Sequence, residues 1–87
     1  STRVRRMHSP FVAMIGSIVE RGRLAGDFRE GVDAVQLYIS IAGLSYFYLA
    51  NNHTLSEIFG RDLKARKARE ARLAHMTEFV LGYLQKA

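Results

Sequence analysis

The residue types that most often carry chemistry are few and scattered in this sequence. There is no Cys, which excludes disulfides, cysteine-bound zinc and thiol nucleophiles. The three His residues do not share the spacing of metal ligands, and His75 with Glu78, three residues on, forms at most half of a metal site. No Ser lies in a nucleophile elbow, and no phosphate loop surrounds Gly26 and Gly31. We therefore predict no catalytic residue, no metal site and no cofactor, and we do not expect an enzyme.

Basic residues are the next candidates, because the chain has 13 Lys and Arg against 8 Asp and Glu, a net charge of +5. Such an excess permits attraction to nucleic acid without proving it. Six of these residues are crowded together: Arg61, Lys64, Arg66, Lys67, Arg69 and Arg72. They could form a phosphate-contacting helix or simply a solvated half-helix. The second interpretation fits better, because the charges fall on several helix faces and no base-reading side chains are interleaved with them.

These residues must be positioned by helices, because the apolar spacing is helical throughout the 87 residues and no strand pattern occurs. The chain is long enough for one all-α domain with a thin core. Residues 1–8 read as a basic tail or a frayed helix end, and residues 9–87 as the domain. Ser9 and Pro10 suit the start of a first helix that ends near Gly22. Its apolar stripe consists of Phe11, Met14, Ile15, Ile18 and Val19.

A short connection comes next, in which two glycines, Gly26 and Gly31, permit backbone conformations that other residues avoid. Phe28 between them is expected to pack into the core and hold the turn. Two interpretations of Arg29 stay open: a solvated charge, or a planar donor that ties a helix end to a carboxylate.

The second helix is predicted to begin with Asp33 as its cap, with Gln36 completing a capping box. Its sequence is uncharged from Ala34 to Ser56 and apolar on nearly every side, so the helix must be buried all round or lie in lipid. We favour a central helix of a globular domain over a membrane span, because polar residues and tyrosines dilute the stretch. Asn51, Asn52 and His53 are expected to close this helix.

Two further elements complete the predicted fold. Thr54–Glu57 reads as a second capping box that heads a short helical turn, which Gly60 would stop. The last helix is expected over residues 62–85, with Arg66 and Glu70 placed to interact and with an apolar stripe from Leu73 to Leu84.

The composition leaves more apolar surface than one short chain can cover. Three helices can bury one stripe each, but the second helix needs cover on about three sides. Self-association, a missing partner surface or a bound ligand would each supply it.

Taken in order, these features resemble the C-terminal half of TetR-family transcriptional regulators. Gly26-Asp27-Phe28-Arg29 followed by Asp33 is similar to a junction in that half, and the stretch from Tyr46 to Phe59 is similar to the segment after that junction in the family. The resemblance covers roughly residues 9–86. It departs from the family in having Ala34 where Pro is frequent, and in lacking the DNA-reading headpiece and the helices after it.

The resemblance implies a cytoplasmic protein that binds a small, apolar effector and forms a homodimer through a bundle of its last two long helices, here 33–52 and 62–86. The implied dimer contacts are Phe47, Met76, Phe79, Val80 and Tyr83. The implied effector pocket is lined by Met14, Ile18, Tyr38, Ile41, Ser45 and Tyr46. Operator DNA would be bound only through the absent N-terminal helix-turn-helix, and no membrane is expected as a partner. Two alternatives remain: a small nucleic-acid-binding protein acting through residues 61–72, and a pure assembly module.

Overall fold

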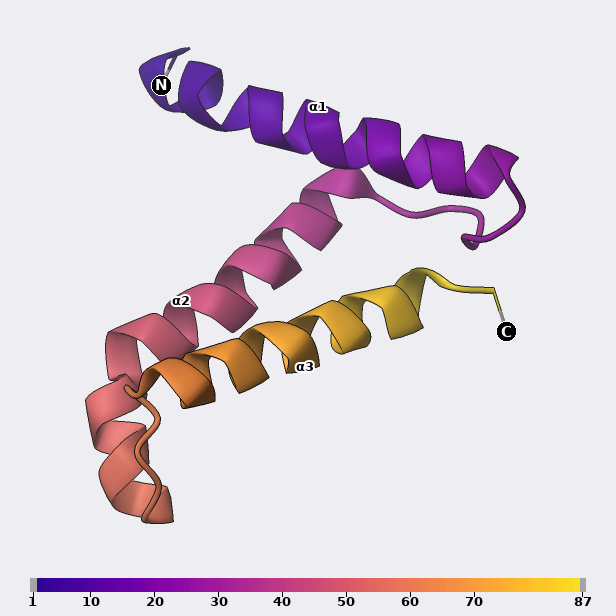
Figure 1. Cartoon of the computed structure of the whole chain (residues 1–87). Coiled ribbons are helices and arrows are strands. Elements are labelled where there is room, and N and C mark those ends of the chain that lie inside the picture. Colours follow the sequence, from indigo (N-terminus) through magenta and orange to yellow (C-terminus); the bar gives the residue numbers. More distant parts are fainter. Residues whose placement is uncertain (1, 87) are drawn as a thin grey trace. The chain divides into compact units, whose positions relative to one another are not determined.

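The regular elements in the described part of the chain are helices. The computed structural model describes residues 2–86, apart from the side chains of residues 4–9. In chain order it has α1 (Thr2–Leu24), α2 (Ala34–Phe59) and α3 (Arg66–Leu84), shown in Figure 1. The predicted all-α fold is confirmed. Packing divides the chain into unit 1 (Ser1–Ser40 with Tyr83–Ala87) and unit 2 (Ile41–Gly82). Across the described residues, none of the helices is both long and apolar enough to cross a bilayer.

Helix α1 starts earlier than expected. The predicted start at Ser9 and Pro10 is wrong, because the helix begins at Thr2 and Pro10 lies inside it. Proline fits best in a first turn, where its missing N–H is not needed, but the Arg- and Met-containing segment before it favours helix. The division into residues 1–8 and 9–87 stays a prediction, and the side chains of Arg5 and Arg6 lie outside the described residues.

Helix α1 ends, as predicted, near Gly22, in a Schellman motif. Gly26 has a φ of 81°, its N–H donates to the Arg23 carbonyl at 3.0 Å, and the Asp27 N–H donates to the Gly22 carbonyl at 2.9 Å. Phe28 lies directly over Gly22, so close that a Cβ at position 22 would overlap the phenyl ring. Phe28 is half-buried, so it does not reach the core as expected, but it does hold the turn by packing over Gly22, which has no side chain to obstruct it.

The connection after α1 is also bound to the end of the chain within unit 1. The Arg29 N–H donates to the Leu84 carbonyl at 2.7 Å, and the Lys86 N–H donates to the Asp27 carbonyl at 3.2 Å. These bonds form an isolated antiparallel bridge between Phe28 and Gln85. The residues after α3 thus complete unit 1.

Helix α2 begins where the sequence predicts. The Asp33 carboxylate accepts hydrogen bonds from the N–H groups of Val35 at 2.9 Å and Gln36 at 3.3 Å, so Asp33 caps two of the free N–H groups of the first turn. The preceding Gly31 has a φ of 77°, a conformation that favours glycine.

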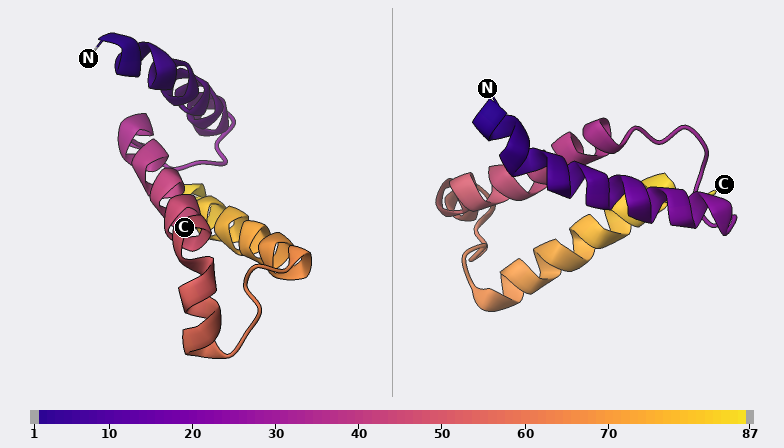
Figure 2. Two further views of the ribbon diagram at one scale, coloured as in Figure 1. Left: turned by 90° about the vertical axis from the view of Figure 1, so that its left-hand side faces the viewer. Right: turned by 90° about the horizontal axis from the view of Figure 1, so that it is seen from above.

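Helix α2 ends later than predicted. The expected stop at Asn51–His53 and the separate capped turn at Thr54 are wrong, because one helix continues to Phe59. Two polar side chains bond back to the helix itself: Asn51 Nδ2 donates to the Phe47 carbonyl at 2.9 Å, and Ser56 Oγ donates to the Asn52 carbonyl at 2.6 Å. Such back-bonding satisfies these groups without ending a helix and often bends it. Figures 1 and 2 show the axis of α2 changing direction in this part of unit 2.

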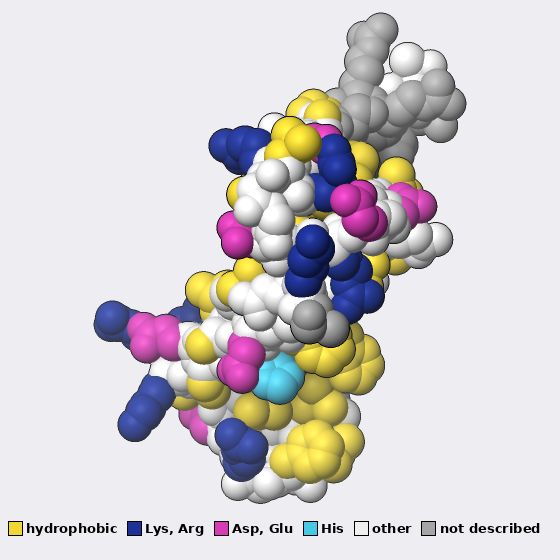
Figure 3. Space-filling model, turned by 90° about the vertical axis from the view of Figure 1, so that its right-hand side faces the viewer, with side chains coloured by type: hydrophobic (Ala, Val, Ile, Leu, Met, Phe, Trp, Pro, Cys, Tyr) yellow, Lys and Arg dark blue, Asp and Glu magenta, His cyan; other side chains and the backbone are white. Residues whose placement is uncertain are grey.

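The core of each unit is small. The buried hydrophobic residues are Val19, Leu37 and Leu84 in unit 1 and Tyr48 in unit 2, and none of the described side chains is completely buried. Many large hydrophobic residues stay exposed, including three of the five in the predicted α1 stripe, and Figure 3 shows hydrophobic side chains between the charged ones on one face. The described residues therefore leave much apolar surface uncovered, as the composition predicts.

Candidate functional site

Unit 2 contains a groove of roughly 670 Å³, which we call the Arg72 groove. Its lining combines aromatic and aliphatic side chains with three basic ones: Phe47, Tyr48, Leu55, Phe59, Arg61, Leu63, Ala68, Ala71, Arg72 and His75. No carboxylate is among these lining residues. A mostly apolar hollow with a few polar groups is the usual form of a small-molecule site.

One wall of the groove is the connection between α2 and α3, which is held firmly against α2. The Leu63 N–H donates to Ser56 Oγ at 2.9 Å, and Tyr48 donates its hydroxyl hydrogen to the Leu63 carbonyl. The connection leaves α2 at Gly60, which has a φ of 64° and ends the helix as predicted. Figures 1 and 2 show it running back along the last turns of α2. This wall is therefore formed before any ligand arrives.

Arg72 is the half-buried cation of the groove. Its Nη2 donates to the Leu44 carbonyl at 3.0 Å, and its guanidinium carbon lies 5.7 Å from the centre of the Tyr48 ring. Its Nε is buried and has no hydrogen-bond partner among the described residues. A buried donor without a partner costs about 1–3 kcal/mol. Arg72 is therefore anchored at one nitrogen and unsatisfied at another.

A smaller hollow of about 280 Å³ also lies on α3 in unit 2, lined by His75, Glu78, Phe79 and Gly82. The centres of the His75 and Phe79 rings are 6.3 Å apart. The described residues contain no group of three or more side chains suited to hold a metal ion. A histidine–carboxylate pair that sequence reasoning missed is His53 with Glu57, four residues apart with Nε2 and Oε1 separated by 3.6 Å.

The predicted effector residues are divided between the two units. Met14, Ile18 and Tyr38 belong to unit 1, whereas Ile41, Ser45 and Tyr46 belong to unit 2, and none of the six lines the Arg72 groove. Ser45 contacts Met76, with Oγ and Sδ 3.9 Å apart, while Tyr46 is exposed. The effector pocket as predicted thus stays a prediction.

The predicted dimer contacts lie on α2 and α3. Phe47, Phe79 and Tyr83 are exposed, and Met76 and Val80 are half-buried. Tyr83 also serves within unit 1, where the Arg29 guanidinium carbon lies 4.6 Å from the centre of its ring. Arg29 therefore stacks on an aromatic ring, an arrangement that neither interpretation of the sequence included.

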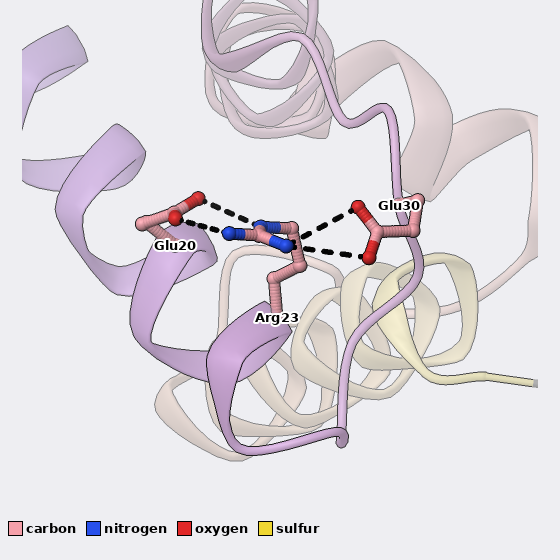
Figure 4. A network of polar contacts seen from close by, with 3 residues as sticks. All are labelled: Glu20, Arg23 and Glu30. Atoms are coloured by element: carbon pink, nitrogen blue, oxygen red, sulfur yellow. Dashed lines mark hydrogen bonds and ion pairs between the residues drawn. The ribbon is translucent and has the colours of Figure 1, made fainter.

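Arg23 forms two ion pairs in unit 1, as Figure 4 shows. Its Nη2 lies 2.6 Å from Glu20 Oε1, and its Nη1 lies 3.3 Å from Glu30 Oε1. The hydrogen bond from Arg23 lowers the pKa of Glu20, and the two carboxylates raise the pKa of Arg23. The spacing of Glu20 and Arg23 is i,i+3, which the sequence shows directly. The contact of Arg23 with Glu30 instead depends on the turn that lies between these two residues.

The basic run does not present a uniform charged face. Arg66 pairs with Glu70 at 3.2 Å, as predicted, and Lys64 Nζ lies 3.2 Å from His53 Nδ1. Arg72 turns toward Leu44 instead of solvent. Sequence reasoning grouped Arg72 with the exposed charges. Its position four residues before Met76, on the apolar stripe of α3, was the signal that separates it from them.

Comparison with known proteins identifies the family. A family model described as "Tetracyclin repressor-like, C-terminal domain" matches residues 1–80. The chain is similar to the HTH-type transcriptional repressor NicS of Pseudomonas putida, with 31% identity over 86 residues, or 99% of this chain and 41% of that protein. The chain thus spans less than half the length of this relative. No solved structure matches it. The family match covers most of the chain, whose named elements among the described residues are helices, and it shows that the protein belongs to the family of TetR-like C-terminal domains.

Proposed function

We propose that this chain is the sensing and dimerisation part of a TetR-type transcriptional repressor, acting in the cytoplasm. The observation that carries the proposal is the exposed apolar surface of α2 and α3, on which Phe47, Phe79 and Tyr83 remain uncovered. Exposed apolar surface of this kind usually marks an interface or a ligand site. The family consists of regulators and not enzymes, which supports a non-catalytic role.

The dimer would use the bundle formed by α2 and α3 of two copies. Its proposed contacts are Phe47, Met76, Phe79, Val80 and Tyr83. A two-fold dimer repeats each contact, so this face of one copy covers the same face of the other.

The proposed effector is small and apolar, and it would contact Met14, Ile18, Tyr38, Ile41, Ser45 and Tyr46. In the intact regulator, effector binding would favour one arrangement of the dimer and so change the spacing of two DNA-binding headpieces. Operator half-sites lie about 34 Å apart, so a change in this spacing weakens operator binding. Repression then depends on the effector concentration.

Sedimentation of the chain over two orders of magnitude in concentration tests the dimer. We expect a dimer that Phe79→Asp dissociates, because an unpaired carboxylate would be buried at the interface. Leu24→Asp is the matched control: Leu24 is 72% exposed and Phe79 is 60% exposed, but Leu24 lies outside the proposed interface. A monomer at every concentration, or equal effects of the two substitutions, contradicts the proposed interface.

Effector sensing is tested on an intact regulator that contains this domain, by titrating candidate ligands against operator binding. We expect a ligand that binds the domain to lower operator affinity, and Met14→Ala to reduce that response. Val35→Ala is a suitable control, since Val35 is 52% and Met14 55% exposed. Domain-binding ligands that leave operator affinity unchanged would show that the domain does not sense.

A further inference from the structure

We infer that the Arg72 groove binds a small carboxylate that carries an apolar body. This site is separate from the effector residues proposed above, because none of those residues lines the groove. Carboxylate binding in the groove therefore does not depend on the proposed effector pocket.

The charge of the groove selects an anion. Arg61, Arg72 and His75 line it and no carboxylate does, so a negative group placed there meets two permanent positive charges without a competing acidic side chain. Arg72 is the best placed of the three, because it is half-buried and its guanidinium is already oriented by the Leu44 carbonyl and the Tyr48 ring. A guanidinium has five N–H donors, and the hydrogen bond to Leu44 uses one of them.

The remaining lining selects the body of the ligand. Phe59, Leu55 and Leu63 offer apolar surface, and Ala68 and Ala71 leave space beside them. A carboxylate matches the planar fork of one guanidinium in shape, and its single charge suits a hollow in which Arg72 is the one half-buried cation. The combination of one oriented cation and a mainly apolar hollow therefore fits an organic carboxylate.

The connection that carries Leu63 is held in place before binding, by Tyr48 and Ser56. A preformed wall reduces the ordering that a ligand must impose, which favours binding by a small molecule. The other candidate occupant is an acidic side chain from a second copy of the chain, because Phe47 belongs both to the groove and to the proposed dimer face.

Phenylacetate and its neutral isostere phenylacetamide are the probes, followed by heteronuclear NMR titration of the whole chain. We expect phenylacetate to shift the amide signals of Leu55, Ala68 and Ala71, to bind more tightly than phenylacetamide, and to weaken as salt is added. Equal binding of the two probes, or shifts at Met14 and Ile18 instead, overturns the inference. Shifts at Met14 and Ile18 would at the same time favour the proposed effector site, so the two hypotheses fail separately.

Arg72→Gln is expected to weaken phenylacetate binding by about tenfold or more, since it removes a charged hydrogen-bond donor from the site. Arg69→Gln, an exposed arginine of the same helix outside the groove, is the matched control and should leave binding unchanged. If Arg72→Gln impairs folding, Ala71→Phe fills the groove while keeping Arg72, and it too should abolish binding. Unchanged binding in the folded Arg72→Gln or Ala71→Phe variant overturns the inference. The inference is also overturned if the chain does not bind phenylacetate and Arg72→Gln dissociates the dimer. That result would mean that Arg72 binds an acidic group of the second copy.

Discussion

The contact between Gly22 and Phe28 predicts that a single added methyl group destabilises the protein. Alanine is ordinarily the better helix former, by about 1 kcal/mol relative to glycine. At position 22, however, the new Cβ would overlap the Phe28 ring. Overpacking of this kind costs about 1–3 kcal/mol. Because the new Cβ would overlap several atoms of the ring, the cost lies at the upper end of this range, about 2–3 kcal/mol. Subtracting the helix-propensity gain of about 1 kcal/mol, we expect Gly22→Ala to lower the free energy of unfolding by about 1–2 kcal/mol.

Gly82→Ala is the matched control, because Gly82 is also helical and, beyond its neighbours and the backbone of its own helix, no described atom lies within 4 Å of the position its Cβ would take. This substitution should raise stability by about 0.5–1 kcal/mol. Urea unfolding followed by circular dichroism, at one fixed protein concentration, compares the two. Each kcal/mol corresponds to a shift in Tm of about 4–8 °C in a domain of this size, so thermal melts give an independent measure.

A double-mutant cycle with Phe28→Ala then tests the cause of the effect. Phe28→Ala alone should destabilise, because it removes apolar burial, but in that background the further change Gly22→Ala should be neutral or stabilising. Two results would refute the reasoning: Gly22→Ala as stable as the parent chain, or Gly22→Ala equally harmful with and without the Phe28 ring. Either would mean that the phenyl ring does not lie over this glycine in solution.

Three further predictions concern the polar contacts. Asp33→Ala should lower the free energy of unfolding by about 1 kcal/mol through loss of the α2 cap, whereas Asp33→Asn should retain most of it, as urea unfolding will measure. Tyr48→Phe should lower the free energy of unfolding by about 1 kcal/mol, because it removes the hydrogen bond to the Leu63 carbonyl, and unchanged stability in urea unfolding would contradict that bond. Arg23 lowers the folded-state pKa of Glu20 below its ordinary value of 4.5, so the stabilisation is present above that pH and is lost as pH falls through the lowered pKa. Glu20→Gln should therefore remove part of the pH dependence of Tm in this acidic range, and an unaltered pH profile would show that the pair does not contribute.

Sequence patterns located the helices well where a cap or a glycine marks the boundary. Gly26, Asp33 and Gly60 each act through local backbone geometry, which the sequence reveals directly. The patterns gave wrong boundaries where a helix-start signal can stand either at the start of a helix or inside one. Ser9-Pro10 and Thr54–Glu57 are valid helix starts, but both lie inside helices because neighbouring residues also favour helix. A start signal permits a helix to begin and does not require the preceding one to end.

The candidate site was less accessible to sequence reasoning. The Arg72 groove exists because the connection after α2 returns along that helix. Two hydrogen bonds hold the connection there: the Leu63 N–H donates to Ser56 Oγ, 7 residues away, and the Tyr48 hydroxyl donates to the Leu63 carbonyl, 15 residues away. No periodicity encodes such pairings. Arg72 itself looked like one more charge in a basic run, and only its place on the apolar stripe of α3 distinguishes it from its exposed neighbours.

The exposed apolar residues and Arg72 need different kinds of binding partner. Exposed side chains such as Phe79 have lost no hydrogen bond and need only contact with another apolar surface, which a second copy can provide. Arg72 Nε is already out of water and needs an acceptor, which an apolar surface cannot supply. A dimer can therefore cover α2 and α3 and still leave Arg72 unsatisfied, unless the partner contributes an acidic group. For this reason the oligomeric state and carboxylate binding must be measured separately, each with its own variants.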